Sequence, residues 1–186
     1  MRDKCILPFL ITERLEFFQL TQADLPELEI LLGDPEIMYA WEHGFTKIES
    51  QAWLNENLRR YSSDGYSYWA VRKKNDGSLI GVMGILKEVA EGKQYIGIGY
   101  ILNKKYWGQG YAGEGTEALC QYAFRKLQLQ TLTAQVRTNN FASQHIAEGL
   151  SMKAMCNFVK IYRGQEMPHF LYTLDRDKWL KTASNG

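Results

Sequence analysis

The stretch YWGQGYAGEG, residues 106–115, carries Gly108, Gly110 and Gly113 in the spacing G-x-G-x-x-G. Such loops bring backbone N–H groups close to a phosphate, and a helix that starts directly after the loop favours negative charge there. The residues that follow have the apolar periodicity of a helix that begins near Ala112. The stretch therefore predicts a site for a phosphate-bearing ligand, or else a plain loop whose glycines serve as turn and cap residues.

The surroundings of this loop do not fit a dinucleotide-binding unit. In a Rossmann unit the first glycine follows the strand directly, and an acidic residue lies about 20 positions further on. Here residues 103–107 separate the strand-like run that ends at Leu102 from the first glycine, and the next run, TLTAQVR, has no acidic residue at its end. No Gly-Lys-Ser or Gly-Lys-Thr follows either, so a Walker A loop is excluded as well.

Two further glycines favour a ligand over a plain loop. Gly113 and Gly115 fall in the first turn of the predicted helix. A glycine there costs up to about 1 kcal/mol relative to alanine, a cost with no evident benefit unless the backbone must approach a ligand. Both glycines therefore count toward a binding site.

The rest of the chain predicts a mixed sheet with helices. We expect a strand over 10–20, a short helix, and a second helix with Thr46 as N-cap and Glu49 at the third helical position. Three strand-like runs, YSYWAVRKK, LIGVMGIL and QYIGIGYIL, then predict an antiparallel meander before the loop. After the loop and its helix come a strand, a short helix and two strands that turn at Gly164. The predicted order is β-α-α-β-β-β-α-β-α-β-β.

Composition narrows the class of protein. The 186 residues suit one domain, and 22 basic against 21 acidic residues give no basic excess for nucleic acid. No apolar run approaches the length of about 18 residues that a spanning helix needs, and the apolar stretch near the N-terminus is too short for a secretory signal. Cys5, Cys120 and Cys156 lack metal-ligand spacing and suit reduced thiols. We expect a soluble cytoplasmic protein that binds neither nucleic acid nor a membrane.

The stretch YILNKKYWGQGYAGEGTEALCQYAF, followed after one strand by VRTNNFASQHIAEGLSM, resembles the GCN5-related N-acetyltransferases (GNAT), in particular the ribosomal-protein N-terminal acetyltransferases. The form Trp-Gly-x-Gly-Tyr-Ala-x-Glu, over residues 107–114, carries most of this resemblance, and Lys105 replaces the usual Arg or Gln. The resemblance implies a single GNAT domain over residues 1–186, with its core over about 10–180. The implied α/β (α+β) fold has a mixed, mostly antiparallel seven-stranded sheet flanked by about four helices.

The resemblance also implies acetyl-CoA as cosubstrate, an amine as acceptor and no metal. The loop would bind the pyrophosphate, the strand before it would bind pantetheine through its main chain, and Asn140 and Ser143 would contact the pantetheine amide and approach the sulfur. From the residues alone, Asn140 and Ser143 also suit a helix cap, but after the matching loop we favour the ligand role. The expected cofactor-binding residues are Tyr100, Ile101, Leu102, Lys105, Trp107, Gly108, Gln109, Gly110, Tyr111, Ala112, Gly113, Asn140 and Ser143.

The catalytic groups are less well marked. Relatives often carry a glutamate two residues before the Gly-Tyr pair of the strand, and here that place holds Gly97. Many relatives use a tyrosine seven residues after the asparagine as the general acid, and here that place holds Ala147. In the ribosomal-protein branch the serine of N-x-x-S is the suspected acid, so the resemblance implies Ser143 as the general acid. Glu42 and His43 are the pair expected to meet the amine, although a solvated loop at that place, with water as the base, is the alternative.

These expectations leave three functional hypotheses. The leading hypothesis is an acetyl-CoA-dependent N-acetyltransferase that acts on a primary amine, either a protein N-terminus or a small molecule, as a monomer or homodimer. The alternative is a catalytically idle acyl-CoA-binding module or sensor, because the usual carboxylate and tyrosine are missing. A nicotinamide-dependent enzyme is a weaker third hypothesis. His145 is expected to be exposed, and His169 is a further candidate beside the acceptor.

Overall fold

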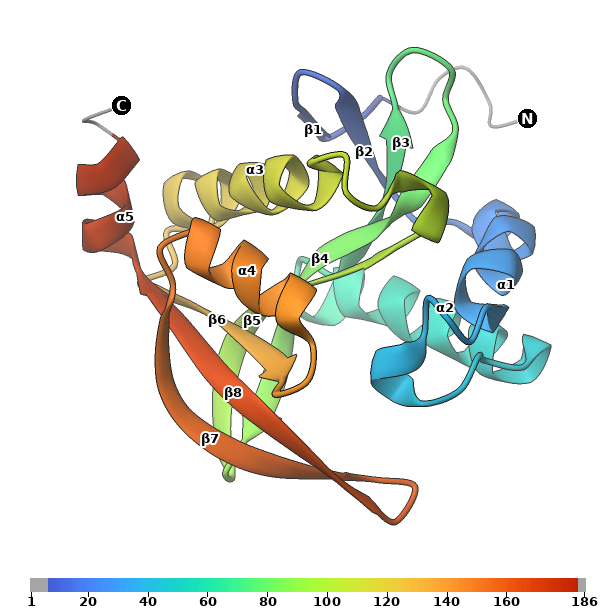
Figure 1. Ribbon diagram of the computed structural model, residues 1–186. Coiled ribbons are helices and arrows are strands. Elements are labelled where there is room, and N and C mark those ends of the chain that lie inside the picture. Colours follow the sequence, from blue (N-terminus) through green and yellow to red (C-terminus); the bar gives the residue numbers. More distant parts are fainter. Residues whose placement is uncertain (1–6, 184–186) are drawn as a thin grey trace. The chain divides into compact units, whose positions relative to one another are not determined.

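The computed structural model describes residues 7–183, which form eight strands and five α-helices (Figure 1). The strands are β1 (Leu10–Ile11), β2 (Leu15–Gln19), β3 (Tyr68–Lys73), β4 (Leu79–Ala90), β5 (Lys93–Leu102), β6 (Thr131–Arg137), β7 (Lys153–Tyr162) and β8 (Gln165–Asp175). The α-helices are α1 (Leu25–Gly33), α2 (Lys47–Ser63), α3 (Tyr111–Arg125), α4 (Phe141–Gly149) and α5 (Arg176–Ala183). Short 3-10 turns cover Gln22–Asp24, Tyr39–Trp41 and Lys104–Tyr106.

The hydrogen-bonded order of the strands is β1-β2-β3-β4-β5-β6-β8-β7. β5 and β6 run parallel, whereas β1 with β2, β2 with β3, β3 with β4, β6 with β8 and β7 with β8 run antiparallel. The mixed, mostly antiparallel sheet confirms the predicted fold class, with eight strands in place of seven and five helices in place of four.

One of the two additional elements has a local cause and the other a long-range one. The strand predicted over 10–20 is interrupted because Thr12 forms a turn: its Oγ1 accepts from Leu15 N at 2.9 Å, so β1 folds back on β2. Helix α5 was not predicted from the sequence. Trp179 on α5 packs on Phe124 of α3, with 5.5 Å between the ring centroids, and this contact is long-range in sequence.

The chain divides into two compact units. One comprises Met1–Gly84 and Gly99–Gly115, and the other comprises Ile85–Ile98 and Thr116–Gly186. The boundaries cross β4, β5 and α3, so each of these three elements belongs partly to each unit. The single domain expected from the sequence stays a prediction.

In the first unit, helix α2 begins as the sequence predicts. Thr46 is the N-cap, and its Oγ1 accepts from Glu49 N at 3.2 Å. The Glu49 carboxylate accepts in return from Thr46 N at 2.8 Å. This reciprocal capping box satisfies two backbone donors of the first turn and fixes where the helix starts.

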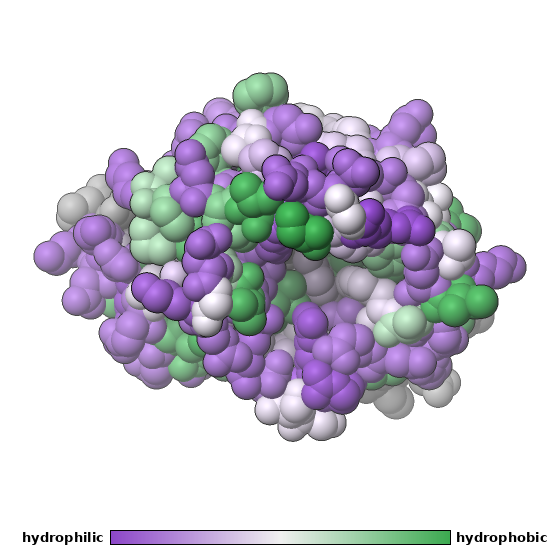
Figure 2. All heavy atoms as spheres, turned by 90° about the horizontal axis from the view of Figure 1, so that it is seen from below, coloured by the Kyte–Doolittle hydropathy of each residue, from purple (hydrophilic) through white to green (hydrophobic). Residues whose placement is uncertain are grey.

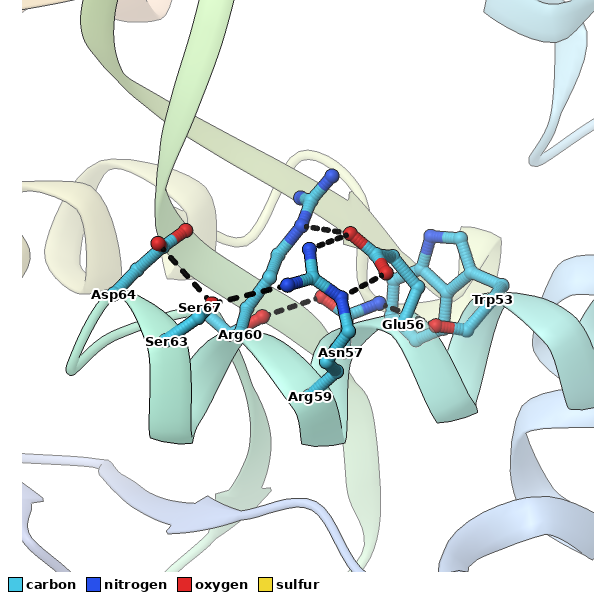
Figure 3. A network of polar contacts seen from close by, with 8 residues as sticks. All are labelled: Trp53, Glu56, Asn57, Arg59, Arg60, Ser63, Asp64 and Ser67. Carbon is cyan, nitrogen blue, oxygen red and sulfur yellow. Dashed lines mark hydrogen bonds and ion pairs between the residues drawn. The ribbon is translucent and has the colours of Figure 1, made fainter.

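Farther along α2, a buried pair of hydrogen bonds ties the helix to the segment before β3 (Figure 3). Asn57 is 1% exposed; its Nδ2 donates to Trp53 O at 2.7 Å, and its Oδ1 accepts from Ser67 Oγ at 2.6 Å. Glu56, on the solvent side, pairs with Arg59 and Arg60. The buried pair is the more important contact for stability, because burying an amide without partners is costly whereas exposed ion pairs contribute little.

In the second unit, β6, β7 and β8 form a continuous antiparallel ladder. β8 pairs with β6 from Thr131↔Asp175 to Arg137↔His169, and on its other edge with β7. Ala90, Phe158 and Leu171 form a small buried cluster, with Tyr95 packed against it. This cluster connects the β4–β5 hairpin to the β7–β8 pair.

The surface and the thiols are ordinary. On the face drawn in Figure 2 hydrophilic residues predominate, and hydrophobic residues occur in small groups. Within the described part of the chain no helix is long and apolar enough to cross a membrane, and no three His, Cys, Asp or Glu side chains gather as a metal site. Cys120 and Cys156 are free thiols, and burial raises the pKa of Cys120 to about 12. Cys5 lies outside the described residues.

Candidate functional site

The loop between β5 and α3 has a backbone conformation that glycine adopts far more readily than other residues. Gly108 has φ +71° and Gly110 has φ +80°. A Cβ atom added at Gly108 would meet no heavy atom within 4 Å, so the backbone conformation, and not crowding, calls for glycine there. The two glycines and Gln109 are exposed, and α3 begins at the next residue, Tyr111.

Gly113 and Gly115 differ in the space that surrounds them. A Cβ at Gly113 would enter open space, which is consistent with the predicted approach of a ligand. A Cβ at Gly115 would lie 2.2 Å from Met83 Sδ and 2.7 Å from its Cε. Gly115 thus allows α3 to pack closely on β4, so it has a structural benefit that the sequence interpretation missed, and it does not count toward a ligand site.

Glu114, in the first turn of α3, fixes the loop to the β1–β2 turn. Its Oε1 accepts from Thr12 Oγ1 at 2.5 Å and from Arg14 N at 2.9 Å, and its Oε2 accepts from Arg14 Nε at 2.6 Å. Arg14 Nη1 donates to Gln109 O at 3.0 Å, and its guanidinium lies 4.3 Å from the centroid of the Tyr111 ring. We call this arrangement the Arg14–Glu114 pair. It fixes the loop backbone on both sides of Gly110.

The Arg14–Glu114 pair was not predicted. Partial burial alone raises the pKa of Glu114, but hydrogen bonds from Thr12 and Arg14 outweigh it and hold the pKa below its ordinary value. The carboxylate is therefore ionised throughout the neutral range and remains a charged partner for Arg14. The sequence held a signal for it, since Glu114 closes the quoted Trp-Gly-x-Gly-Tyr-Ala-x-Glu form, but its partners lie about a hundred positions earlier in the chain.

Residues on both sides of Gly108 hydrogen-bond to the backbone of the segment before it. Trp107, although 46% exposed, donates from its indole Nε1 to Leu102 O at 2.9 Å. Gln109 Nε2 donates to Lys105 O at 2.8 Å. Ile101 and Leu102 are buried and Tyr100 is half-buried. The Leu102 carbonyl, which lies on the predicted pantetheine path, is thus engaged by Trp107.

Asn140 and Ser143 lie at the start of α4, in the second unit. Asn140 is the N-cap, and its side-chain Oδ1 accepts from Ser143 N at 3.0 Å. The cap uses only the oxygen of the amide, and Nδ2 is a donor of the kind that a pantetheine carbonyl requires. The structure thus shows the capping role, and the predicted contact of Asn140 and Ser143 with the cofactor stays a prediction.

Glu42 and His43 are adjacent, but His43 contacts a different glutamate. Its Nδ1 lies 3.0 Å from Trp41 O and its Nε2 lies 3.2 Å from Glu49 Oε1. A hydrogen bond from the Thr46 backbone, followed by one from His43, lowers the pKa of Glu49 to about 2. Glu42 ends the 3-10 turn in the left-handed conformation, with φ 62°. Both nitrogens of His43 thus have structural partners, and the catalytic role of Glu42 and His43 stays a prediction.

The two other histidines differ in environment. His145 is exposed, as predicted. His169 is 7% exposed; its Nδ1 lies 2.7 Å from Met167 O, and its ring packs on Phe158. Burial lowers the pKa of His169, so its imidazole is neutral at physiological pH.

The protein is similar to known acetyltransferases. An acetyltransferase (GNAT) domain model matches residues 14–153. The chain is 30% identical over 144 residues to the uncharacterized protein YkkB of Bacillus subtilis, covering 77% of this chain and 84% of that protein. It is 28% identical over 189 residues to FsC-acetyl coenzyme A-N(2)-transacetylase of Aspergillus fumigatus, covering 94% of this chain and 79% of that protein. A crystal structure of a GNAT-family acetyltransferase from Bacillus anthracis superposes with a TM-score of 0.78 at 22% identity, covering 90% and 98% of the two chains.

The structural superposition agrees with the fold described above. The domain match spans most of the chain and includes both the loop and the start of α4. The enzymes of this family use acetyl-CoA. The chain therefore belongs to the GNAT family of acetyltransferases and is an acetyl-CoA-dependent acyltransferase.

Proposed function

We propose that the protein transfers an acetyl group from acetyl-CoA to a primary amine, and that the loop before α3 binds the pyrophosphate of the cosubstrate. The observation that carries this proposal is the exposed backbone at Gly108 and Gly110, which have positive φ angles and are fixed by the Arg14–Glu114 pair. An exposed glycine backbone next to the N-terminus of a fifteen-residue helix suits an anion on electrostatic grounds.

The loop residues fit this ligand in size and charge. Gly108, Gly110 and Gly113 present no side chain that would block a phosphate, and an added Cβ at Gly113 would enter open space. Lys105 and Arg14 are exposed cationic residues of the loop and of its neighbouring turn, and Arg14 is paired with Glu114. We assign pyrophosphate binding to the loop, and pantetheine binding to the main chain of Tyr100 to Leu102 and to Asn140.

The chemistry needs three events. The neutral amine nitrogen attacks the thioester carbonyl carbon and forms the new N–C bond. The C–S bond then breaks, and its electron pair leaves with the sulfur. One proton is lost from the nitrogen and one is taken up by the thiolate, and we assign the second to the hydroxyl of Ser143. General acid catalysis at the sulfur stabilises the leaving group in the transition state.

The acceptor belongs to one of two classes of primary amine. The resemblance of residues 107–114 to the ribosomal-protein N-terminal acetyltransferases supports a peptide N-terminus. The name of the Aspergillus relative, an N(2)-transacetylase, supports a small molecule with an amino group at that position. A peptide N-terminus has an α-amine whose pKa near 8 leaves a useful neutral fraction at physiological pH.

A screen of named acceptors tests this function. Purified protein and acetyl-CoA are mixed with a serine-initiated hexapeptide, L-ornithine or spermidine, and the acetylated products are measured by mass spectrometry. Mass detection is preferable to a thiol reagent because Cys156 is exposed and would react. We expect turnover with at least one amine. Binding of coenzyme A without turnover on any acceptor class would favour an acyl-CoA sensor, and absence of binding would contradict the proposal altogether.

A further inference from the structure

The carboxylate of Glu88 lies directly over Gly97. Glu88 is on β4, Gly97 is on β5, and both belong to the second unit. A Cβ atom built on Gly97 would lie 2.2 Å from Glu88 Oε2, 2.9 Å from its Cδ and 3.5 Å from its Cγ. Real Cβ atoms do not approach other atoms that closely. The glycine is therefore what allows the carboxyl group to occupy this place.

The backbone at Gly97 does not itself require glycine. Gly97 is absent from the residues with positive φ, and it lies inside β5, where it pairs with Thr133 of β6. A glycine inside a strand weakens it and commonly marks a place where another group approaches closely. Here that group is the half-exposed side chain of Glu88, whose Oε2 is buried. The missing side chain on β5 is thus replaced by a carboxylate that arrives from the neighbouring strand.

The position of Gly97 along β5 relates the Glu88 carboxylate to the proposed cofactor site. The proposed pantetheine path follows Tyr100 to Leu102, next to the loop that would bind the pyrophosphate. Under the proposed function the pantetheine arm would lead from the loop back along the main chain of β5, and Gly97 stands three residues before Tyr100 in that strand. Three residues of a strand span about 10 Å, a distance that an acceptor amine and one water molecule fill.

We propose that Glu88 is the general base of the acetyl transfer, and this inference rests on the function proposed above. The Glu88 carboxylate accepts, directly or through one water, the proton that the attacking amine loses as its nitrogen forms the bond to the thioester carbon. The protonated Glu88 then returns that proton to solvent. The electron pair of the broken C–S bond stays on the sulfur, which takes its own proton from Ser143, and Ser143 then regains a proton from solvent.

Substitutions at Glu88 and Gly97, with a control at Glu91, test the assignment. Glu88→Gln keeps the size of the side chain and removes its basicity, and Glu91→Gln removes an exposed glutamate from the turn of the same hairpin as a matched control. The double variant Glu88→Ala with Gly97→Glu transposes the carboxylate from one strand to the other. Each variant is assayed by mass spectrometry with the best acceptor among the serine-initiated hexapeptide, L-ornithine and spermidine. Its affinity for acetyl-CoA is measured by calorimetry.

We expect Glu88→Gln to lower kcat by about 100-fold or more, with the dissociation constant of acetyl-CoA within about threefold of the unaltered protein, because a base acts in the transition state. Glu91→Gln should leave both unchanged. Gly97→Glu alone displaces the flexible end of the Glu88 side chain and brings two carboxylates together, so it should be less active than the unaltered protein, and the double variant should exceed Glu88→Ala in kcat by about tenfold.

The outcomes distinguish a failure of the Glu88 assignment from a failure of the proposed function. Unchanged kcat in Glu88→Gln, or a folded double variant no more active than Glu88→Ala, would overturn the assignment of Glu88 and leave acetyl transfer standing. If the unaltered protein binds acetyl-CoA but acetylates none of the three acceptors, the proposed function fails and the assignment of Glu88 fails with it.

Discussion

Helices α2 and α3 both begin with a glutamate in the first turn, but the two carboxylates are used differently. Glu49 of α2 turns back to its own N-cap, Thr46, three residues away. Glu114 of α3 instead accepts from Thr12 and Arg14 and so ties the helix start to a distant turn. The first arrangement closes a helix on itself. The second fixes a glycine loop from outside, which leaves the loop itself without a capping side chain of the Thr46 kind and suits it for a ligand.

A side chain at Gly110 should have the largest effect of any change at these two helix starts. Gly110→Val should reduce coenzyme A affinity by at least about 100-fold, because a β-branched residue resists the φ of +80° and blocks the approach of a phosphate to the backbone. Gly65→Val is the matched control, since Gly65 has φ +81° in an exposed turn after α2. Calorimetry and thermal unfolding distinguish the two. Equal affinity in a folded Gly110→Val protein would remove the loop from the binding site.

The start of α4 offers a third kind of helix start, in which the cap itself is proposed to face a substrate. Ser143→Ala should lower kcat by about 10²–10⁴-fold and leave the acetyl-CoA dissociation constant within a few fold, since only a transition-state interaction is lost. Asn140 accepts from the backbone N of Ser143, so the cap survives this substitution. Full kcat with a lowered melting temperature would show that Ser143 is only a helix-start residue.

Substitutions of Glu114 and Glu49 compare the two helix starts directly. Glu114→Gln should weaken coenzyme A binding by up to about tenfold, because Arg14 loses its charged partner and the loop loosens; the half-exposed pair limits the effect. Glu49→Gln should lower the melting temperature and leave the affinity unchanged. Equal changes in affinity for the two variants would mean that the Arg14–Glu114 pair has no special relation to the loop.

The smallest expected effect is on the loss of folding stability at low pH. The pKa of Glu49 in the folded protein is about 2, and that of Glu114 also lies below its ordinary value. Such carboxylates stabilise the fold above their unfolded pKa, and this stability is lost as the pH falls from about 4.5 toward 2. Chemical unfolding between pH 5 and 2.5 should show a shallower decline for Glu49→Gln than for the unaltered protein. Parallel declines would contradict the capping account of this residue.

The features that sequence reasoning found are those whose partners are near in the chain. Thr46 and Glu49 are three residues apart, and the cap of α2 was predicted and is confirmed. The fold class was likewise recoverable from alternating runs and turns. Gly108 and Gly110 were recognised because positive φ leaves a residue-type signal.

The features that sequence reasoning missed depend on contacts between distant segments. Arg14 meets Glu114 across a hundred positions, and Gly115 is small because Met83 packs against it. Glu88 approaches Gly97 only because two strands are neighbours with one particular register. A missing carboxylate at Gly97 was therefore visible in the sequence, whereas the carboxylate that takes its place was not.

We propose that the loop between β5 and α3 binds the pyrophosphate of coenzyme A. This is tested by comparing coenzyme A with pantetheine, which lacks the pyrophosphate and nucleotide. Calorimetric titration of the unaltered protein should give an affinity for coenzyme A at least about 100-fold higher, equivalent to roughly 2.7 kcal/mol. The Gly110→Val protein should lose most of that difference. Similar affinities for the two ligands in the unaltered protein would contradict the account.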